Sequence, residues 1–165
     1  NYRASGRDLE FKAIDHLRGG TQADDFDFML DGRVEGSIDG KGGKDQLDFS
    51  EYNSPISVTL TEVGTTDGFR GTTAGSPNPI AIGGITPWSF QNIDGIVGGD
   101  NPSSFDTLIG QDENADWMVY KDNFETNTRV ENSPHPDAGD YRSEGRTLDF
   151  EHFENLTGGT EADTF

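Results

Sequence analysis

Short apolar runs recur along the chain, separated by clusters of Gly, Asn, Asp and Thr. Such runs predict β-strands at residues 46–49, 57–60, 117–120 and 147–150, and residues 57–60 alternate between polar and apolar positions. No stretch keeps a helical period, because the same turn-forming residues interrupt it. The pattern therefore predicts an all-β protein.

The sequence repeats itself after 139 residues. Residues 1–26 align without a gap on residues 140–165, and 13 of the 26 aligned positions are identical. Recurrence at a fixed distance is typical of tandem arrays in which one structural unit stacks on the next. We therefore expect residues 1–139 to form one long repeat and residues 140–165 to begin the next, within one continuous solenoid cut from a longer array.

A shorter, imperfect unit lies inside the long repeat: a glycine pair, a few polar residues, an Asp and an apolar residue. It occupies residues 19–26, 40–47 and 158–165, with weaker copies at 98–108 and 110–117. Strands and turns at this spacing, without Asn-Gly hairpin signals, predict parallel coils stacked into a β-solenoid, that is, a β-helix or β-roll. Roughly six or seven coils would extend the array by about 30 Å per long repeat.

Two segments break this pattern. Residues 64–87 are rich in Gly, Thr and Pro, and residues 132–139 carry two prolines. We expect both to be loops that leave the solenoid, and such loops commonly form binding surfaces. Solvated loops without a partner are the simpler alternative.

Composition restricts the partners. Twelve Lys and Arg stand against 31 Asp and Glu, for a net charge of −19, which argues against nucleic acid and favours cations. No apolar run is long enough to span a bilayer, so membrane insertion is not expected. Only 30% of the residues are hydrophobic, but Phe recurs at matching places in the units, which predicts an ordered, repetitive core. These residues are Phe11, Phe26, Phe90, Phe150, Phe153 and Phe165.

The short unit also carries candidate chemistry. Residues 40–48 (GKGGKDQLD) match the nonapeptide G-G-x-G-x-D-x-(apolar)-x except at Lys41, and residues 19–27 (GGTQADDFD) match it except at Gln22. In that pattern glycines let backbone carbonyls point inward, and Asp adds a hard anionic oxygen of the kind that calcium prefers. At these residues the chain resembles the hemolysin-type (RTX-like) calcium-binding repeats of giant repetitive bacterial surface proteins and adhesins.

The resemblance implies a secreted, calcium-binding β-roll or β-helix at the bacterial cell surface or outside the cell. Carried over by position, the calcium ligands would be the side chains of Asp24, Asp45, Asp163, Asp106 and Asp116 and the carbonyls of Gly19, Gly40 and Gly158. The chain departs from the family because its nonapeptides do not follow one another directly. The alternative is that these Asp side chains cap turns through nearby backbone amides.

The expected function is that of a structural repeat segment in a secreted fibre, stalk or adhesin stabilised by Ca²⁺, and not an enzyme. Its partners would be other copies of itself, along or between fibres, and surface glycans. Two alternatives stay open: a carbohydrate-binding module that uses Trp88, and a polysaccharide-active β-helix enzyme that uses Asp24, Asp25 and Asp27 with Trp88 or Trp117. Against the enzyme, Asp25 becomes Thr164 in the second copy.

Overall fold

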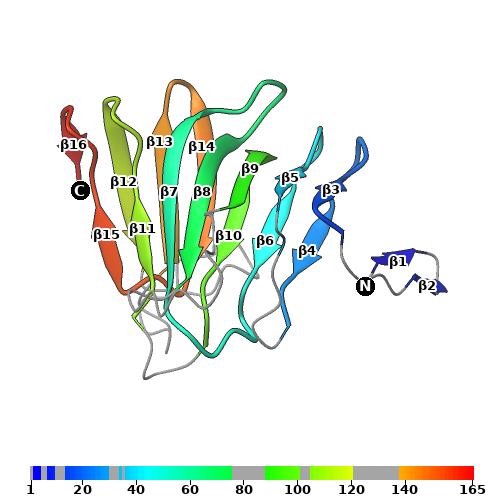
Figure 1. Cartoon of the computed structure of the whole chain (residues 1–165). Coiled ribbons are helices and arrows are strands. Elements are labelled where there is room, and N and C mark those ends of the chain that lie inside the picture. The colour runs from blue at the N-terminus through cyan, green and yellow to red at the C-terminus, as the bar shows by residue number, and fades with distance from the viewer. Residues whose placement is uncertain are drawn as a thin grey trace.

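The computed structural model describes residues 2–4, 7–9, 14–29, 34, 36–75, 88–100, 105–120 and 138–165. Within these ranges the regular secondary structure is all β, as the residue pattern predicts. The strands form two seven-stranded, mostly parallel sheets and one separate two-stranded sheet (Figure 1). The described segments include no helix long and apolar enough to cross a membrane.

The first sheet has the strand order β15-β11-β7-β8-β9-β5-β3, and the second has the order β16-β12-β13-β14-β10-β6-β4. The first contains β3 (His16–Arg18), β5 (Ser37–Asp39), β7 (Ile56–Val63), β8 (Phe69–Gly75), β9 (Trp88–Ile93), β11 (Thr107–Ile109) and β15 (Asn155–Thr157). The second contains β4 (Asp25–Asp27), β6 (Gln46–Asp48), β10 (Gly95–Val97), β12 (Ala115–Tyr120), β13 (Ala138–Ser143), β14 (Arg146–Glu151) and β16 (Asp163–Thr164). The separate sheet pairs β1 (Tyr2–Ala4) with β2 (Arg7–Leu9).

The chain passes repeatedly from the first sheet to the second, which gives the strand pairs β3–β4, β5–β6, β9–β10, β11–β12 and β15–β16. Strands of neighbouring pairs run parallel, as β4, β6 and β10 do in the second sheet. All four strands expected from the sequence are present: residues 57–60, 117–120 and 147–150 lie within β7, β12 and β14, and residues 46–49 overlap β6, which ends at Asp48.

An antiparallel strand interrupts each sheet near its middle, so the expectation of parallel stacking throughout is wrong there. In the first sheet β8 runs antiparallel to both β7 and β9. In the second, β13 runs antiparallel to both β12 and β14. The β13–β14 reversal uses Glu144 and Gly145, which both have positive φ. Consecutive residues of this kind form the tight hairpin turns that match strand twist.

The predicted loop at residues 64–87 is wrong in its first half. The chain turns at residues 64–68, where the Gly64 N–H donates to the Gly68 carbonyl at 2.9 Å, and then forms β8. Gly71 fits inside the sheet because the ring of Phe90 covers it; an added Cβ would lie 2.5 Å from that ring. Of the other predicted loop, residues 138 and 139 belong to β13. Residues 76–87 and 132–137 lie outside the described residues.

Inward-facing side chains from both sheets form one hydrophobic core. Of the Phe residues expected there, Phe90, Phe150 and Phe153 are buried, Phe26 is partly buried, and Phe165 is 69% exposed. Phe11 lies outside the described residues.

Candidate functional site

The glycine pair and the Asp of the short unit form one hydrogen-bonded turn. In its first copy, Asp24 Oδ2 accepts the N–H of Gly20 at 2.5 Å. A Cβ added to Gly19 would lie 2.6 Å from the same oxygen. The first glycine therefore leaves room for the carboxylate, and the second supplies a backbone donor to it.

The weaker unit at residues 98–108 forms the same arrangement despite its insertion. Asp106 Oδ2 accepts the N–H of Gly99 at 2.5 Å, and a Cβ on Gly98 would lie 2.8 Å from that oxygen. Asp106 is fully buried. Its carboxylate thus satisfies a buried backbone donor, as a turn-capping Asp does.

The unit at residues 40–47 differs because Lys41 stands in place of the second glycine. Lys41 has a φ of 80°, and its N–H donates to Asp39 Oδ1 at 3.2 Å instead of to Asp45. Asp45 is fully buried, and its Oδ2 has no hydrogen-bond partner within the described part of the chain. At residues 40–47 the departure from the glycine pair thus coincides with an unsatisfied carboxylate oxygen.

Acidic side chains also connect neighbouring strand pairs. Asp45 Oδ1 accepts the N–H of Asp24 at 2.9 Å, and Asp94 Oδ2 accepts the N–H of Asp45 at 3.2 Å. We call Asp24, Asp45 and Asp94 the first acidic ladder; each immediately precedes a strand of the second sheet.

A second acidic ladder, Asp106 and Glu154, precedes strands of the first sheet. Asp106 Oδ1 accepts the N–H of Ile56 at 2.9 Å, and Glu154 Oε2 accepts the N–H of Asp106 at 2.6 Å. Asp106 and Asp45 therefore make the same two kinds of hydrogen bond. In each, one carboxylate oxygen accepts a backbone N–H from a neighbouring segment, and the backbone N–H of the Asp donates to the next acidic side chain.

The last acid of each ladder follows the same kind of corner. Asn92 and His152 both have positive φ, 56° and 58°, and each lies two residues after a buried Phe. Asp94 and Glu154 follow two residues later. The sequence pairs these corners, as residues 90–94 (FQNID) and 150–154 (FEHFE).

Burial and neighbouring carboxylates raise the pKa values of Asp45 and Asp94 in the first acidic ladder. Burial raises the pKa of Asp45 to about 6, and the negative charges of Asp24, Asp94 and Asp67 add to the shift. Burial also raises the pKa of Asp94, again with a contribution from Asp67. In the second ladder burial raises the pKa of Asp106, although the N–H groups of Ile56 and Gly99 oppose the shift.

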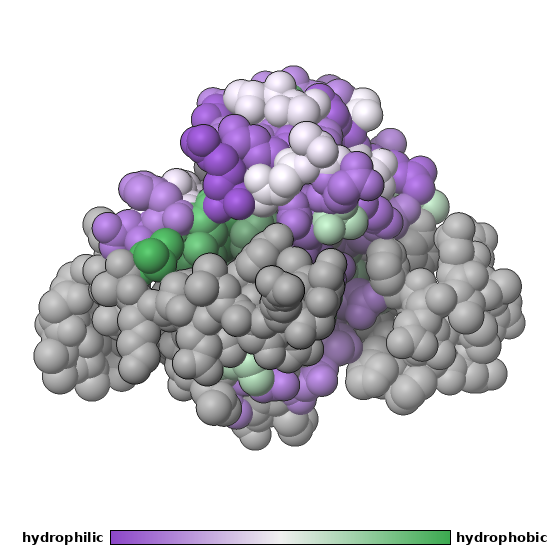
Figure 2. Space-filling model, turned by 90° about the vertical axis from the view of Figure 1, so that its right-hand side faces the viewer, coloured by the Kyte–Doolittle hydropathy of each residue, from purple (hydrophilic) through white to green (hydrophobic). Residues whose placement is uncertain are grey.

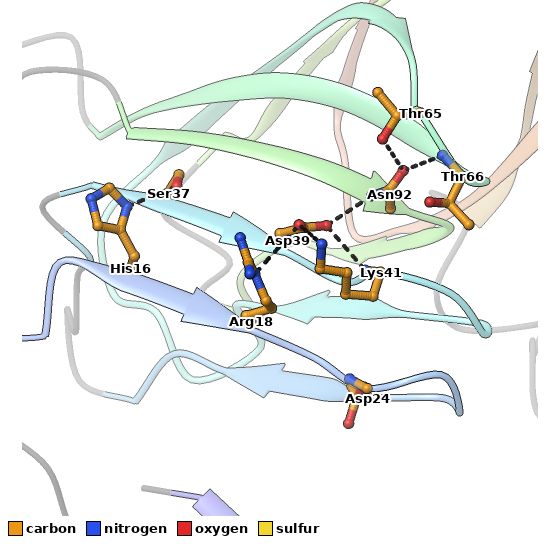
Figure 3. Close-up of polar contacts among 10 residues, drawn as sticks. His16, Arg18, Asp24, Ser37, Asp39, Lys41, Thr65, Thr66 and Asn92 are labelled. Carbon is orange, nitrogen blue, oxygen red and sulfur yellow. Dashed lines mark hydrogen bonds and ion pairs between the residues drawn. The ribbon is translucent and has the colours of Figure 1, made fainter.

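Basic and amide side chains compensate a further buried acid, Asp39, beside the first ladder (Figure 3). Asn92 Nδ2 donates to Asp39 Oδ1 at 2.7 Å, and Lys41 Nζ lies 2.8 Å from Asp39 Oδ2. Burial acts to raise the pKa of Asp39, but hydrogen bonds from Lys41, Asn92 and Gln91 outweigh it and lower that pKa. Lys41 therefore pairs with Asp39 and leaves Asp45 uncompensated.

The structure brings together two of the predicted ligand side chains, Asp24 and Asp45, which belong to the turns of Gly19 and Gly40. It does not bring the other three to them. Asp106 precedes β11 in the first sheet. Asp116 lies exposed on β12, opposite Arg142.

Asp163 and the third turn glycine, Gly158, lie at the far end of the sheets. The predicted ligands therefore occupy several separate turns.

Two acids near Asp45 were missed from the sequence, Asp94 and Asp67. Asp94 lies in the corner pattern and could have been found by aligning residues 90–94 with 150–154. Asp67 accepts the N–H of Gly43 through Oδ2 at 3.2 Å, while its Oδ1 is buried without a hydrogen-bond partner in the described structure. Its place in a turn between antiparallel strands carries no sequence signal.

Among the described residues, no group of three or more His, Cys, Asp or Glu side chains is arranged to hold a metal ion. The side chains of Asp24, Asp94 and Asp106 accept backbone N–H groups instead. This arrangement supports the turn-capping interpretation of these residues. In the segments that the structure describes, Asp45, Asp67 and Asp163 each have a buried carboxylate oxygen without a hydrogen-bond partner, and these oxygens could take a cation. Asp39 Oδ2 also lacks a hydrogen bond, but Lys41 Nζ lies 2.8 Å from it.

The residues of the carbohydrate alternatives do not form a common surface. Trp88 is 7% exposed and packs on Phe28 with ring centroids 5.1 Å apart. Trp117 is 3% exposed and packs on Tyr141 at 4.6 Å. Neither indole offers a free face on which a sugar could stack, so the structure gives these alternatives no platform.

Comparison of the chain with protein-family models, with curated proteins and with solved structures found no match.

Proposed function

We propose that the chain is a structural repeat segment of a β-solenoid fibre, stalk or adhesin, in which copies stack along the direction of the strand order. The observation that carries this proposal is incomplete burial at both ends. Leu17 and Phe26 of the pair β3–β4 are only partly buried. Their neighbours in register, Ile38 and Leu47, are fully buried.

The opposite end has the same property. Leu156 is partly buried and Phe165 is 69% exposed, whereas Leu108, in register with Leu156, and Trp117, which stacks on Phe165, are 0% and 3% exposed. Leu17 and Phe26 align with Leu156 and Phe165 in the 139-residue repeat. One further strand pair at either end would bury these side chains.

The positions of the two repeated strand pairs, β3–β4 and β15–β16, support an array in which each repeat is shifted along the strand order. The pairs β3–β4 and β15–β16 lie at opposite edges of the same two sheets (Figure 1). Figure 2 views the β3–β4 end, where an apolar area lies among hydrophilic residues. Six strand spacings separate β4 from β16, so each repeat would add about 29 Å at about 4.8 Å per strand.

The test compares the chain with forms in which residues 1–139 are added once or twice before it. Small-angle X-ray scattering should show one rod whose maximum dimension grows by about 29 Å per added copy. Copies that tumble as separate bodies would contradict the proposal. Leu17→Glu in an inner copy, where Leu17 becomes buried, should bend or break the rod, and Thr21→Glu, at an exposed turn position, serves as the control.

Calcium binding is a second part of the proposal, and the buried, unsatisfied Asp45 Oδ2 favours it. Asp67 Oδ1 is a second such oxygen, and Asp24, Asp67 and Asp94 all act electrostatically on Asp45. Oxygen ligands of this type suit Ca²⁺. A cation at Asp45 would supply the positive charge that Lys41 gives to Asp39.

Thermal melting followed by circular dichroism should show a higher Tm in Ca²⁺ than in a chelator, with a smaller rise in Mg²⁺. Asp45→Asn should abolish most of the difference, whereas Asp116→Asn, on an exposed strand, should preserve it. Identical melting with and without Ca²⁺ would reject the calcium part and leave the fibre part standing.

The resemblance to RTX-like repeats supports placement of such a fibre outside the cell or at the bacterial cell surface. The net charge of −19 supports cations as partners in preference to nucleic acid. Other copies of the chain are proposed as partners because of the incompletely buried ends of the sheets. Surface glycans are a further proposed adhesion target. Binding of the rod to immobilised polysaccharides tests this, and a rod that carries Trp88→Ala, a change in the core, is the control.

A further inference from the structure

The hairpin β1–β2 pairs only with itself in the described structure, yet its twin in the second copy lies inside a sheet. β1–β2 forms a separate sheet near the N-terminus (Figure 1). Its register pairs Tyr2 with Leu9. In β13–β14 the aligned residues Tyr141 and Leu148 pair in the same way. The two hairpins therefore share both sequence and strand register.

The second-copy hairpin fills a slot between β12 and β10. β13 pairs with β12 in antiparallel fashion, and β14 pairs with β10 in parallel fashion. Both β10 and β12 belong to residues 1–139. The second sheet of one long repeat is thus completed by the hairpin that begins the next.

Apolar contacts hold the hairpin in this slot. Tyr141 is fully buried, with its ring 4.6 Å from that of Trp117 and 5.4 Å from that of Phe69. Its hydroxyl oxygen accepts the N–H of Gln111 at 3.1 Å. Leu148 is also fully buried. The side chains that receive Tyr141 all lie within the first 139 residues.

Polar contacts set the position of the hairpin. Arg146 Nη2 donates to the Thr66 carbonyl at 3.1 Å, and Lys44 Nζ lies 2.6 Å from Asp149 Oδ2. Thr66 and Lys44 again belong to the first 139 residues.

The first copy keeps the chemistry of these contacts. The residues that align with Tyr141, Arg146, Leu148, Asp149 and Phe150 are Tyr2, Arg7, Leu9, Glu10 and Phe11. Four are identical, and the fifth keeps its carboxylate. The positions that change include Ser143, which becomes Ala4 and so loses its contact with Gln111 Nε2. If β1–β2 made no contact with another repeat, these five residues would not need to match the residues that hold β13–β14 between β12 and β10.

We propose that β1–β2 is a donor hairpin that inserts between β12 and β10 of the preceding 139-residue repeat in the array, at the place that β13–β14 takes within this chain. β1 pairs with β12 of that repeat in antiparallel fashion, and β2 pairs with its β10 in parallel fashion. Neighbouring copies then interlock by a shared sheet as well as by end-to-end stacking. This inference rests on the proposed array and specifies how its copies join.

Disulfide trapping tests the predicted register in a tandem of residues 1–139 followed by the complete chain. The protein has no cysteine, so any disulfide that forms must join the engineered cysteines. Asp116 and Arg142 are exposed register partners, and partners in an antiparallel pair lie within disulfide reach. Asp116→Cys with Arg142→Cys in the second copy is therefore the benchmark.

The test pair is Asp116→Cys in the first copy with Arg3→Cys in the second. It should oxidise to the same extent as the benchmark, measured by non-reducing electrophoresis and peptide mass. Asp116→Cys with Asp8→Cys, one strand further away, is the matched control and should remain reduced.

Scattering by the same tandem separates the two levels of the proposal. A rod of two-copy length in which the benchmark oxidises and the Arg3 pair does not would overturn the donor hairpin and leave the array intact. Oxidation of the Arg3 pair in a tandem that is not rod-like would uphold the hairpin and reject the fibre.

Discussion

At the residue scale, the two glycines and the Asp of the recurring unit have distinct roles in the turn. Gly19 leaves space for the carboxylate of Asp24, and Gly20 donates its N–H to it. Where Lys41 replaces the second glycine, the donor is lost to Asp39 and the pKa of Asp45 rises to about 6. In these copies, the residue after the first glycine thus determines whether a backbone N–H is directed at the Asp carboxylate.

The space around each glycine predicts that alanine substitution at two nearby positions, Gly40 and Gly42, will affect the free energy of unfolding very differently. A Cβ on Gly40 would clash with the carbonyl of Asn92 and the carboxylate of Asp45, whereas the nearest atom to a Cβ on Gly42 lies 3.6 Å away. Gly40→Ala should lower the free energy of unfolding by about 2 kcal/mol or more, and Gly42→Ala should change it little. Urea unfolding measures both; equal effects would contradict this role for Gly40.

The raised pKa of Asp45 predicts an unusual dependence of stability on pH in metal-free buffer. The folded state binds a proton at Asp45 more tightly than the unfolded state, whose pKa is near 3.8. The contribution of Asp45 to stability is therefore fully present below about pH 4 and is lost as pH rises through about 6.

Denaturation at a series of pH values measures this loss. Asp45→Asn keeps an oxygen acceptor for the Asp24 N–H, so it should flatten the fall between pH 4 and 6 and raise stability at pH 7. Asp25→Asn, an equal charge change on an exposed residue, is the control. A wild-type profile with no fall in this range would refute the assignment.

At the element scale, short strands depend on the acids that precede them. Three-residue strands such as β6 and β11 make few backbone hydrogen bonds to their neighbours. The acidic residue before each strand adds one more hydrogen bond to the neighbouring segment. Asp106 joins three segments in this way, since it accepts from Ile56 and Gly99 and donates to Glu154.

Asp106→Ala would leave two backbone donors without their acceptor, one of them at the start of β7. We expect a loss of about 3 kcal/mol of unfolding free energy. Asp116→Ala, at an exposed position of β12, should cost little, although both residues fit the calcium motif by position. Chemical denaturation in the presence of a chelator distinguishes them, and similar losses would contradict the capping role of Asp106.

At the scale of the whole molecule, the two ends expose what the middle buries. Leu17, Phe26 and Leu156 pack against the core but are only partly buried, so we expect an added copy to supply the neighbour that they lack at an end. In arrays of this kind stability is approximately a sum of repeat and interface contributions.

Thermal stability should therefore rise from one copy to two. Tm measured by differential scanning calorimetry for the chain and for the tandem checks this, with Leu17→Glu in the inner copy expected to cancel the gain. A tandem that melts at the temperature of the single chain would show that the copies do not stabilise each other.

Sequence reasoning identified the repeating turns and the strands beside them, but not the strand order. Residues 46–49 and 117–120 are recognisable as strands because each is a short run with apolar residues between turn-forming segments. Residues 69–75 carry the Gly and Thr that are typical of a loop. They nevertheless form β8, which pairs with β7 and β9, and the absence of a side chain at Gly71 leaves room for the ring of Phe90. The same limit explains why Asp94 and Asp67 were missed beside Asp45.

The sequence by itself determined the all-β class, the 139-residue period and the pairing of glycine with Asp in each turn. These features depend on local sterics and on hydrogen bonds within a few residues, which recur wherever the motif recurs. Only the tertiary structure decided that an antiparallel strand enters each sheet, that Asp45 Oδ2 is buried without a hydrogen-bond donor among the described residues, and that β13–β14 lies between β12 and β10. Those features depend on backbone pairing between distant segments, for which a short motif carries no partner information.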